Sequence, residues 1–230
     1  AGDYIIKVEG EPVNIGGATG VTLNDVVSKI RGEINTDITI TIQRRSVEKP
    51  FDVTLTRAEI KISSVEQTTI DEEIGYIRLN RFTGLTNKEF HEAMQTFFPD
   101  DRIEDVKSLI LDLRYNPGGL LISANAVTDA FLSGGLIVST KGRLTQFNRE
   151  HRATSRTLCP PEVDVIVLIN EYSASGSEIV AGALKDHQRA VLIGEKTYGK
   201  GVVQQRFSLE NGGAISLTIS TYYTPNDVSI

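Results

Sequence analysis

Two nearly continuous apolar runs constrain the fold of this chain more than any other feature. They are VKSLILDL (106–113) and DVIVLIN (164–170). Runs of this length and composition predict strands that are buried on both faces, as in a parallel sheet covered by helices. A helical pattern follows each run, over residues 120–132 and 177–186. We therefore expect an α/β fold with a mostly parallel sheet.

The remaining pattern divides the 230 residues into a small unit, a connector and a larger unit. Residues 1–59 predict a β-rich domain, with a helix at 23–32 between strands at 3–8, 37–44 and 51–57. The polar stretch 60–73 predicts a connector. The α/β unit is expected over residues 74–230. Further elements of that unit are expected at 74–82, 86–98, 135–140, 190–194, 202–209 and 214–223. Thr86 and Glu89 have the spacing of a capping box at the start of the helix over 86–98.

Composition excludes several classes of protein. The net charge of −6 argues against a nucleic-acid-binding surface, which needs clustered Lys and Arg. No apolar stretch approaches the ~20 residues of a membrane-spanning helix. Cys159 is the only cysteine, so the chain forms no internal disulfide and no cysteine metal site. The opening AGDYIIKV is typical of the middle of a domain, which predicts a chain trimmed from a longer protein.

The loops that follow the two apolar runs have unusual compositions, DLRYNPGG (112–119) and NEYSASGSE (170–178). Because the carboxyl ends of parallel strands meet at one edge of a sheet, we expect these loops to lie together there. Ser175 would precede a helix, whose first N–H groups lack intrahelical partners. Gly118, Gly119 and Gly176 would offer backbone N–H groups to a developing oxyanion. Either loop alone is also explained by an ordinary helix entry, with the serine as a helix cap.

GEKTYGKGVVQQ (194–205) adds a base to this pattern. A serine hydroxyl is a weak nucleophile until a base takes its proton, and a neutral lysine amine can be that base. A lysine acting near neutral pH needs a pKa roughly 2–3 units below ~10.4, which burial away from carboxylates provides. We expect Lys200 to point inward between Gly199 and Gly201, with Gln204 on the same face of the strand as its orienting partner. The alternative is an exposed hairpin lysine beside a solvated glutamine.

Other candidate constellations are weaker. Ser46 and Lys49 have the spacing of a penicillin-binding-type dyad, but they lie in a charged turn. Asp186 and His187 suggest a Ser–His–Asp triad with Ser175. They lie, however, at the far end of the helix that Ser175 begins, some eleven residues or ~16 Å away. His91 and His151 stand alone, without the spacing of metal ligands.

The chain resembles the carboxyl-terminal processing (tail-specific) peptidases, which are serine–lysine proteases. The segments that carry the resemblance are SASGSEIVAGALKDHQRAVLIGEKTYGKGVVQ, LILDLRYNPGGLL and TYYTPN. The resemblance covers most of the chain. It implies a protease core of the crotonase- and Clp-like type after a PDZ domain, of which residues 1–59 resemble the latter part. It also implies the nucleophile at Ser175, the base at Lys200 and its partner at Gln204. The oxyanion hole would lie at Gly176 and the turn ending in Gly118 and Gly119.

The resemblance further implies cleavage near the C-termini of proteins or peptides, with no metal or cofactor, outside the cytoplasm, in a possible homo-oligomer. Asp186 and Arg189 fall on positions that we interpret as structural. The chain departs from the family at Gly176, where Ala is usual, and at Asp227 and Val228, where Gly–Arg is usual. Two other functions stay open: a peptide- or apolar-ligand-binding module without turnover, and crotonase-like acyl-CoA chemistry.

Overall fold

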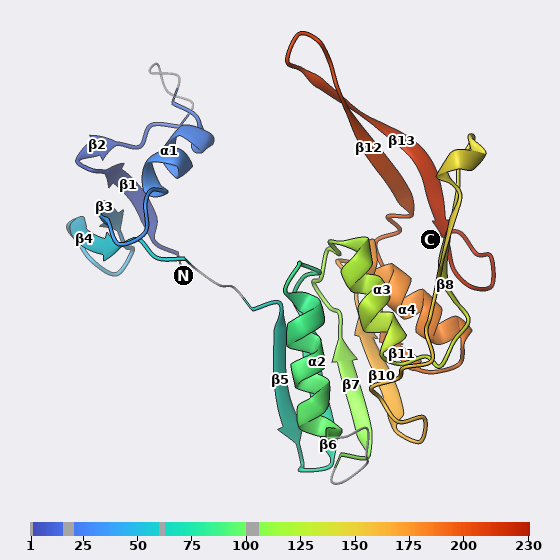
Figure 1. The fold of residues 1–230 in the computed structure, drawn as a ribbon. Helices are drawn as coiled ribbons and strands as arrows, with labels where there is room; N and C mark the ends of the chain where they lie inside the picture. The colour runs from blue at the N-terminus through green and yellow to red at the C-terminus, as the bar shows by residue number, and fades with distance from the viewer. Residues whose placement is uncertain (1, 16–20, 60–62, 100–105) are drawn as a thin grey trace. The chain divides into compact units, whose positions relative to one another are not determined.

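The computed structural model describes residues 2–15, 21–59, 63–99 and 106–230. The chain divides into two compact units, Ala1–Ile62 and Ser63–Ile230 (Figure 1). The structure does not form the predicted connector over residues 63–73, which belong to the second unit. Its residues 60–62 lie outside the described residues, but Val65–Ile70 forms a strand, β5, that pairs with the strand after it. A polar surface on an edge strand explains why the segment looked like a linker.

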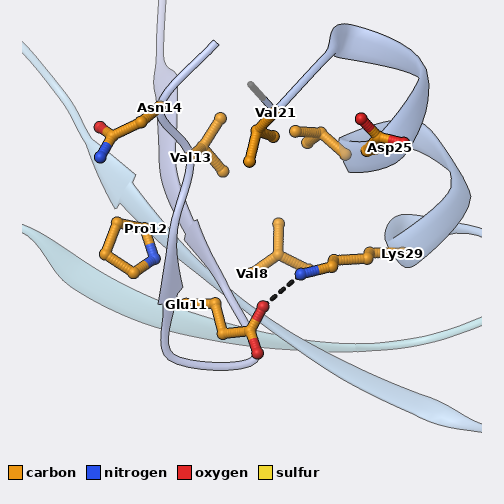
Figure 2. A pocket seen from close by; sticks show the side chains of 9 residues that line it. Val8, Glu11, Pro12, Val13, Asn14, Val21, Asp25 and Lys29 are labelled. Atoms are coloured by element: carbon orange, nitrogen blue, oxygen red, sulfur yellow. Dashed lines mark hydrogen bonds and ion pairs between the residues drawn. The ribbon is translucent and has the colours of Figure 1, made fainter. Parts of the chain in front are cut away.

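The first unit is a four-stranded antiparallel sheet with the order β2-β1-β3-β4, packed against one helix. Its elements are β1 (Tyr4–Val8), β2 (Glu11–Pro12), α1 (Leu23–Ile30), β3 (Asp37–Gln43) and β4 (Phe51–Thr56). Thr22 and Asp25 form a capping box that begins α1. Valines from β1, α1 and the loops between them line a pocket of about 420 Å³ beside the Lys29–Glu11 ion pair (Figure 2). The PDZ interpretation of this unit stays a prediction.

The second unit contains two sheets. The central sheet has the order β11-β10-β7-β6-β5, parallel throughout except for the antiparallel edge strand β5. The second sheet, β12-β13-β8-β9, is antiparallel. The strands are β6 (Ile74–Leu79), β7 (Ser108–Asp112), β8 (Leu136–Lys141), β9 (Arg149–Arg152), β10 (Asp164–Ile169), β11 (Val191–Gly194), β12 (Val202–Ser208) and β13 (Ala214–Tyr223). The α/β prediction is confirmed, but "mostly parallel" holds for the central sheet alone.

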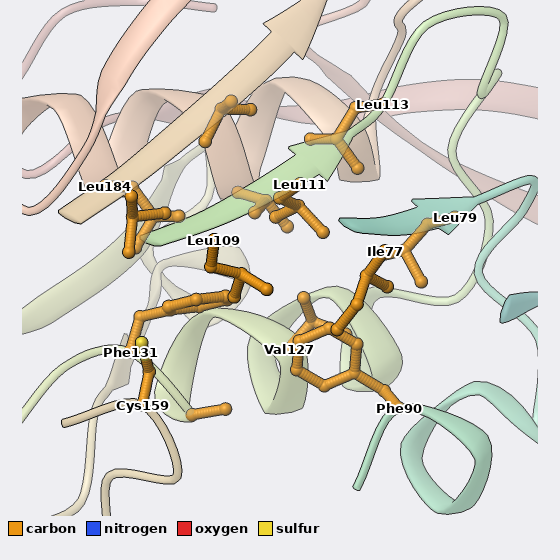
Figure 3. Close-up of a cluster of buried hydrophobic side chains, with 14 of the residues drawn as sticks. Ile77, Leu79, Phe90, Leu109, Leu111, Leu113, Val127, Phe131, Cys159 and Leu184 are labelled. Carbon is orange, nitrogen blue, oxygen red and sulfur yellow. The ribbon is translucent and has the colours of Figure 1, made fainter. Parts of the chain in front are cut away.

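Helices α2 (Thr86–Phe97), α3 (Leu121–Asp129) and α4 (Gly176–Asp186) pack against the central sheet. Alternate residues of β7, Leu109 and Leu111, are fully buried and meet Phe90 of α2 and Val127 of α3 (Figure 3). Ile110, on the opposite face of β7, is only partly buried. The prediction of strands buried on both faces was therefore wrong for the described part of the chain, because the helices cover one face fully.

The predicted capping box at Thr86 is also not formed. Leu85 occupies the N-cap position of α2 without a side-chain hydrogen bond to the helix. The Glu89 carboxylate instead accepts hydrogen bonds from the backbone N–H and the hydroxyl of Ser64, at 2.8 and 2.6 Å. Glu89 thus ties α2 to the start of β5 rather than closing its own helix. Within the described residues, no helix has the length and apolar character needed to cross a membrane.

Candidate active site

Two loops meet at the carboxyl edge of the central sheet, as the sequence predicts. They follow β7 and β10, which are parallel neighbours. The Asn116 carbonyl accepts hydrogen bonds from the Ala174 N–H at 3.0 Å and from the Ser177 hydroxyl at 2.9 Å. The buried Ser173 hydroxyl donates to the Leu113 carbonyl at 2.8 Å. These bonds hold the loop 113–119 directly against the segment that carries Ser175.

Ser175 occupies the N-cap position of α4 with φ +53° and ψ −108°. This backbone region is costly for a residue with a side chain, by about 1–3 kcal/mol, and such strain is concentrated at functional sites. The side chain is half-buried, at the point where the chain turns from β10 into α4. The sequence prediction of a serine between a buried strand and a helix is therefore confirmed.

Gly118 lies against this serine. A Cβ atom added at Gly118 would come within 2.9 Å of the Ser175 Cβ and 2.8 Å of the Gly176 nitrogen. Its φ of +93° also favours glycine. Only a residue without a side chain can lie this close to the backbone of Ser175 and Gly176, and a Cβ atom at Gly118 would crowd the Gly176 N–H, a candidate oxyanion donor.

The N–H of Gly118 differs from the prediction, because it donates to the Asn116 side-chain oxygen at 2.9 Å. Gly119 is placed better for the donor role. Its neighbours bond to Phe82 through the Gly118 carbonyl and the Leu120 N–H, so the Gly119 N–H points away from Phe82. Within the described residues it has no hydrogen-bond acceptor. Gly176 and Gly119, rather than Gly118, therefore remain the candidate oxyanion donors.

Glu178 connects the predicted nucleophile to the predicted base. This buried carboxylate accepts three backbone N–H bonds, from Ser175 at 2.8 Å, Gly199 at 2.6 Å and Lys200 at 2.9 Å. The Ser175 and Lys200 bonds end on the same oxygen, Oε2. The backbones of the two residues are therefore fixed to one atom. Sequence reasoning missed Glu178, although the spacing of Ser175 and Glu178 is that of a capping box.

The side chain of Lys200 does not follow the prediction. It is exposed rather than buried, and no hydrogen bond or ion pair of its amine is found in the part of the chain that the structure describes. It lines a pocket of about 440 Å³ together with Ala174, the residue before Ser175. Gly201 does allow a close approach of two backbones, because a Cβ there would overlap the Ile230 carbonyl. The structure brings the lysine to the site but leaves its amine accessible to water.

Gln204 is not among the residues that line this pocket. It is exposed on β12, which begins two residues after Lys200 and pairs with β13 in a long hairpin (Figure 1). The pairing register shifts between Val203 and Gln204. The prediction that Gln204 orients the base therefore has no contact to support it here, since it extended the alternation of the strand predicted at 202–209 back to Lys200.

Asp112 forms a buried polar cluster beneath the loop 113–119. Its carboxylate accepts hydrogen bonds from Arg114 and, at 2.6 Å, from the Tyr76 hydroxyl. Burial raises the pKa of Asp112, but the Arg114 and Tyr76 hydrogen bonds outweigh it and hold that pKa below its ordinary value. A charged Asp112 therefore fixes the first turn after β7.

The weaker constellations are not assembled at this site. The ring of His187 bonds to the Leu136 carbonyl at 2.7 Å, and Asp186 accepts the Asn226 N–H at 2.9 Å. Arg189 donates to the Val163 and Pro160 carbonyls, among others, in agreement with a structural role.

Comparisons with known proteins agree with this geometry. The model of peptidase family S41 matches residues 73–230. The chain belongs to peptidase family S41. It is 45% identical to a carboxy-terminal-processing protease of Bartonella bacilliformis, covering 100% of this chain and 51% of that protein. It is 34% identical to a carboxyl-terminal-processing protease of Synechocystis, covering 97% of this chain and 50% of the relative.

A solved structure, the photosystem II D1 C-terminal processing protease, matches with a TM-score of 0.65 and 28% identity. The match covers 100% of this chain and 60% of that one. The chain spans about half the length of the curated relatives it matches. The resemblance seen in the motifs is confirmed at the level of the family and of the protease core.

Proposed function

We propose that this chain carries the catalytic site of a serine–lysine peptidase that cleaves proteins or peptides near accessible C-termini. The observation that carries the proposal is the shared carboxylate oxygen of Glu178, which fixes the backbones of Ser175 and Lys200 together. The strained φ of Ser175 and the close approach of Gly118, which has no side chain, to the Gly176 nitrogen support it. As the family resemblance implies, we place this activity outside the cytoplasm.

In the proposed mechanism, the neutral amine of Lys200 takes the proton of the Ser175 hydroxyl as the oxygen attacks the substrate carbonyl. The N–H groups of Gly176 and Gly119 stabilise the resulting oxyanion, and each such donor contributes about 2.7–4 kcal/mol to transition-state stabilisation. The Lys200 ammonium then protonates the departing amine as the carbon–nitrogen bond breaks. A water molecule, deprotonated by the same amine, hydrolyses the acyl-enzyme and restores the serine.

Active-site labelling tests this assignment. We expect a serine-directed acylating probe to add one probe mass to the wild-type chain and to map to Ser175. Ser175→Ala should prevent both labelling and peptide cleavage, while its melting temperature stays within a few degrees of wild type because the half-buried hydroxyl is lost without a large cavity. A Ser175→Ala chain that cleaves peptides at the wild-type rate would refute the mechanism. Peptide binding without labelling or cleavage would favour a binding module, and thioester hydrolysis without peptide cleavage would favour acyl-CoA chemistry.

A further inference from the structure

Three exposed tyrosines surround the pocket beside Ser175. Tyr115, Tyr172 and Tyr198 are 62%, 55% and 69% exposed, and they line this pocket with Pro117, Ala174 and Lys200. The rings of Tyr115 and Tyr172 stack with their centres 5.3 Å apart and an angle of 18° between their planes. The pocket therefore has mainly apolar walls, and the proposed base lies at its edge.

Buried polar groups hold the backbones of these tyrosines in place. The side-chain oxygen of Asn170, itself buried, accepts the N–H groups of Tyr115 at 2.9 Å and Tyr172 at 3.2 Å. The carbonyl of buried Ser173 accepts the N–H of Tyr198 at 3.0 Å. Both anchoring residues, Asn170 and Ser173, belong to the segment 170–175 that ends in Ser175. The backbones of the three tyrosines are thus fixed relative to Ser175, although their rings face solvent.

Stability does not explain this arrangement. Tyr115 has φ +63°, a conformation that costs a residue with a side chain about 1–2 kcal/mol. The three rings together expose aromatic surface in one place, and gathered exposed apolar surface marks binding sites. Tyr115 thus combines a strained backbone with an exposed ring at a position that buried hydrogen bonds hold in place. This combination indicates a role in binding a ligand rather than in folding.

We propose that this tyrosine pocket binds an uncharged apolar side chain, larger than that of alanine, on the substrate residue next to the scissile bond. The inference rests on the proposed function. A peptide whose carbonyl lies at the Ser175 hydroxyl places a neighbouring side chain against Ala174, which precedes the nucleophile. The occupant must be uncharged, because an acidic group would pair with the Lys200 amine and hold it protonated. A cationic group would repel that amine when it carries the serine proton.

A peptide series with alanine, leucine, phenylalanine, lysine or glutamate at either position flanking the scissile bond tests the proposal. For wild type we expect leucine or phenylalanine at one of the two positions to raise kcat/KM about tenfold or more over alanine. Lysine and glutamate at that position should fall below alanine. The double variant with Tyr115→Ala and Tyr198→Ala should lose this preference, so that its kcat/KM for the leucine and phenylalanine peptides falls to that for the alanine peptide.

Matched variants separate the rings from the hydroxyls and from general effects. Tyr115→Phe with Tyr198→Phe should keep the preference, because the aromatic faces remain. Tyr4→Ala removes a similarly exposed tyrosine from the first unit and should change nothing. Equal kcat/KM for alanine, leucine and phenylalanine peptides at both positions would overturn the proposal. A preference that survives the double alanine variant would overturn it as well. A failure of the proposed function differs from both, since the acylating probe would then not label Ser175.

Discussion

The substitution Glu178→Gln tests whether this carboxylate stabilises the fold or positions Lys200 for catalysis. The carboxylate binds three N–H donors, two on Oε2 and one on Oε1. Glutamine has nearly the same shape but only one acceptor oxygen. If that oxygen keeps the bonds to Ser175 and Lys200, the glutamine NH2 group faces the N–H of Gly199, and two donors confront each other. The loop 199–201 must then move away from α4.

The size of the effect follows from the bonds that are lost. A hydrogen bond to a charged group contributes about 1.5–3 kcal/mol, and Glu178→Gln loses at least one. If this free energy positions Lys200 for proton transfer, kcat/KM falls about 10- to 100-fold, since each 1.36 kcal/mol is a factor of ten. If this free energy instead stabilises the folded state as a whole, the melting temperature falls by roughly 2–4 °C for each kcal/mol lost, and the activity is retained.

Cleavage kinetics, the rate of labelling by the acylating probe, and thermal unfolding distinguish these outcomes. Glu89→Gln is the matched control, because Glu89 also accepts two hydrogen bonds from one loop residue, Ser64, in the same unit. We expect both variants to lose stability and only Glu178→Gln to lose labelling and cleavage rates. A Glu178→Gln chain that is labelled and cleaves peptides as fast as the Glu89→Gln control would refute the positioning role of this carboxylate.

Two further substitutions test neighbouring parts of the site. Gly118→Ala should lower kcat about 100-fold or more, because the added Cβ atom blocks the Gly176 N–H. Gly84→Ala is the control, because a Cβ atom at Gly84 has open space. Equal cleavage rates for the two variants would contradict the oxyanion assignment. Asp112→Asn should destabilise the chain at neutral pH by about 1.5–3 kcal/mol. Because the pKa of Asp112 is lowered by Arg114, its contribution is present above pH ~4 and is lost as pH falls through the folded value. Urea unfolding that shows the same acid sensitivity in wild type and Asp112→Asn would contradict this.

The sequence predicted those parts of the site that depend on local pattern. The buried strands β7 and β10 follow from their apolar runs, and parallel pairing then places both loops at one edge. The position of Ser175 at the strand-to-helix turn follows in the same way. Local pattern also located β12 and β13 close to their predicted bounds, 202–209 and 214–223.

The contacts of individual side chains could not be predicted in this way. The burial of Lys200 was inferred from what its chemistry needs, whereas exposure depends on which elements pack over it. The assumed partnership with Gln204 extended the alternation of the strand back to Lys200, which lies outside β12, and took it across a register shift at Val203–Gln204 that only the pairing with distant β13 reveals. Glu178 was overlooked because a glutamate in the first turn of a helix has an ordinary role in capping, and its bonds to Gly199 and Lys200 span more than twenty residues.

The exposed amine of Lys200 changes how the base can be activated. The sequence argument required a dry pocket within the chain, but the structure fixes only the lysine backbone and leaves the amine beside three tyrosines and solvent. A substrate side chain in the tyrosine pocket would displace water from that amine, and desolvation favours the neutral form of an amine. Recognition and activation would then be a single event, because the side chain that selects the substrate also prepares the base. Peptides that leave the pocket empty should therefore be cleaved slowly even when they saturate the site, whereas simple loss of affinity would leave kcat unchanged.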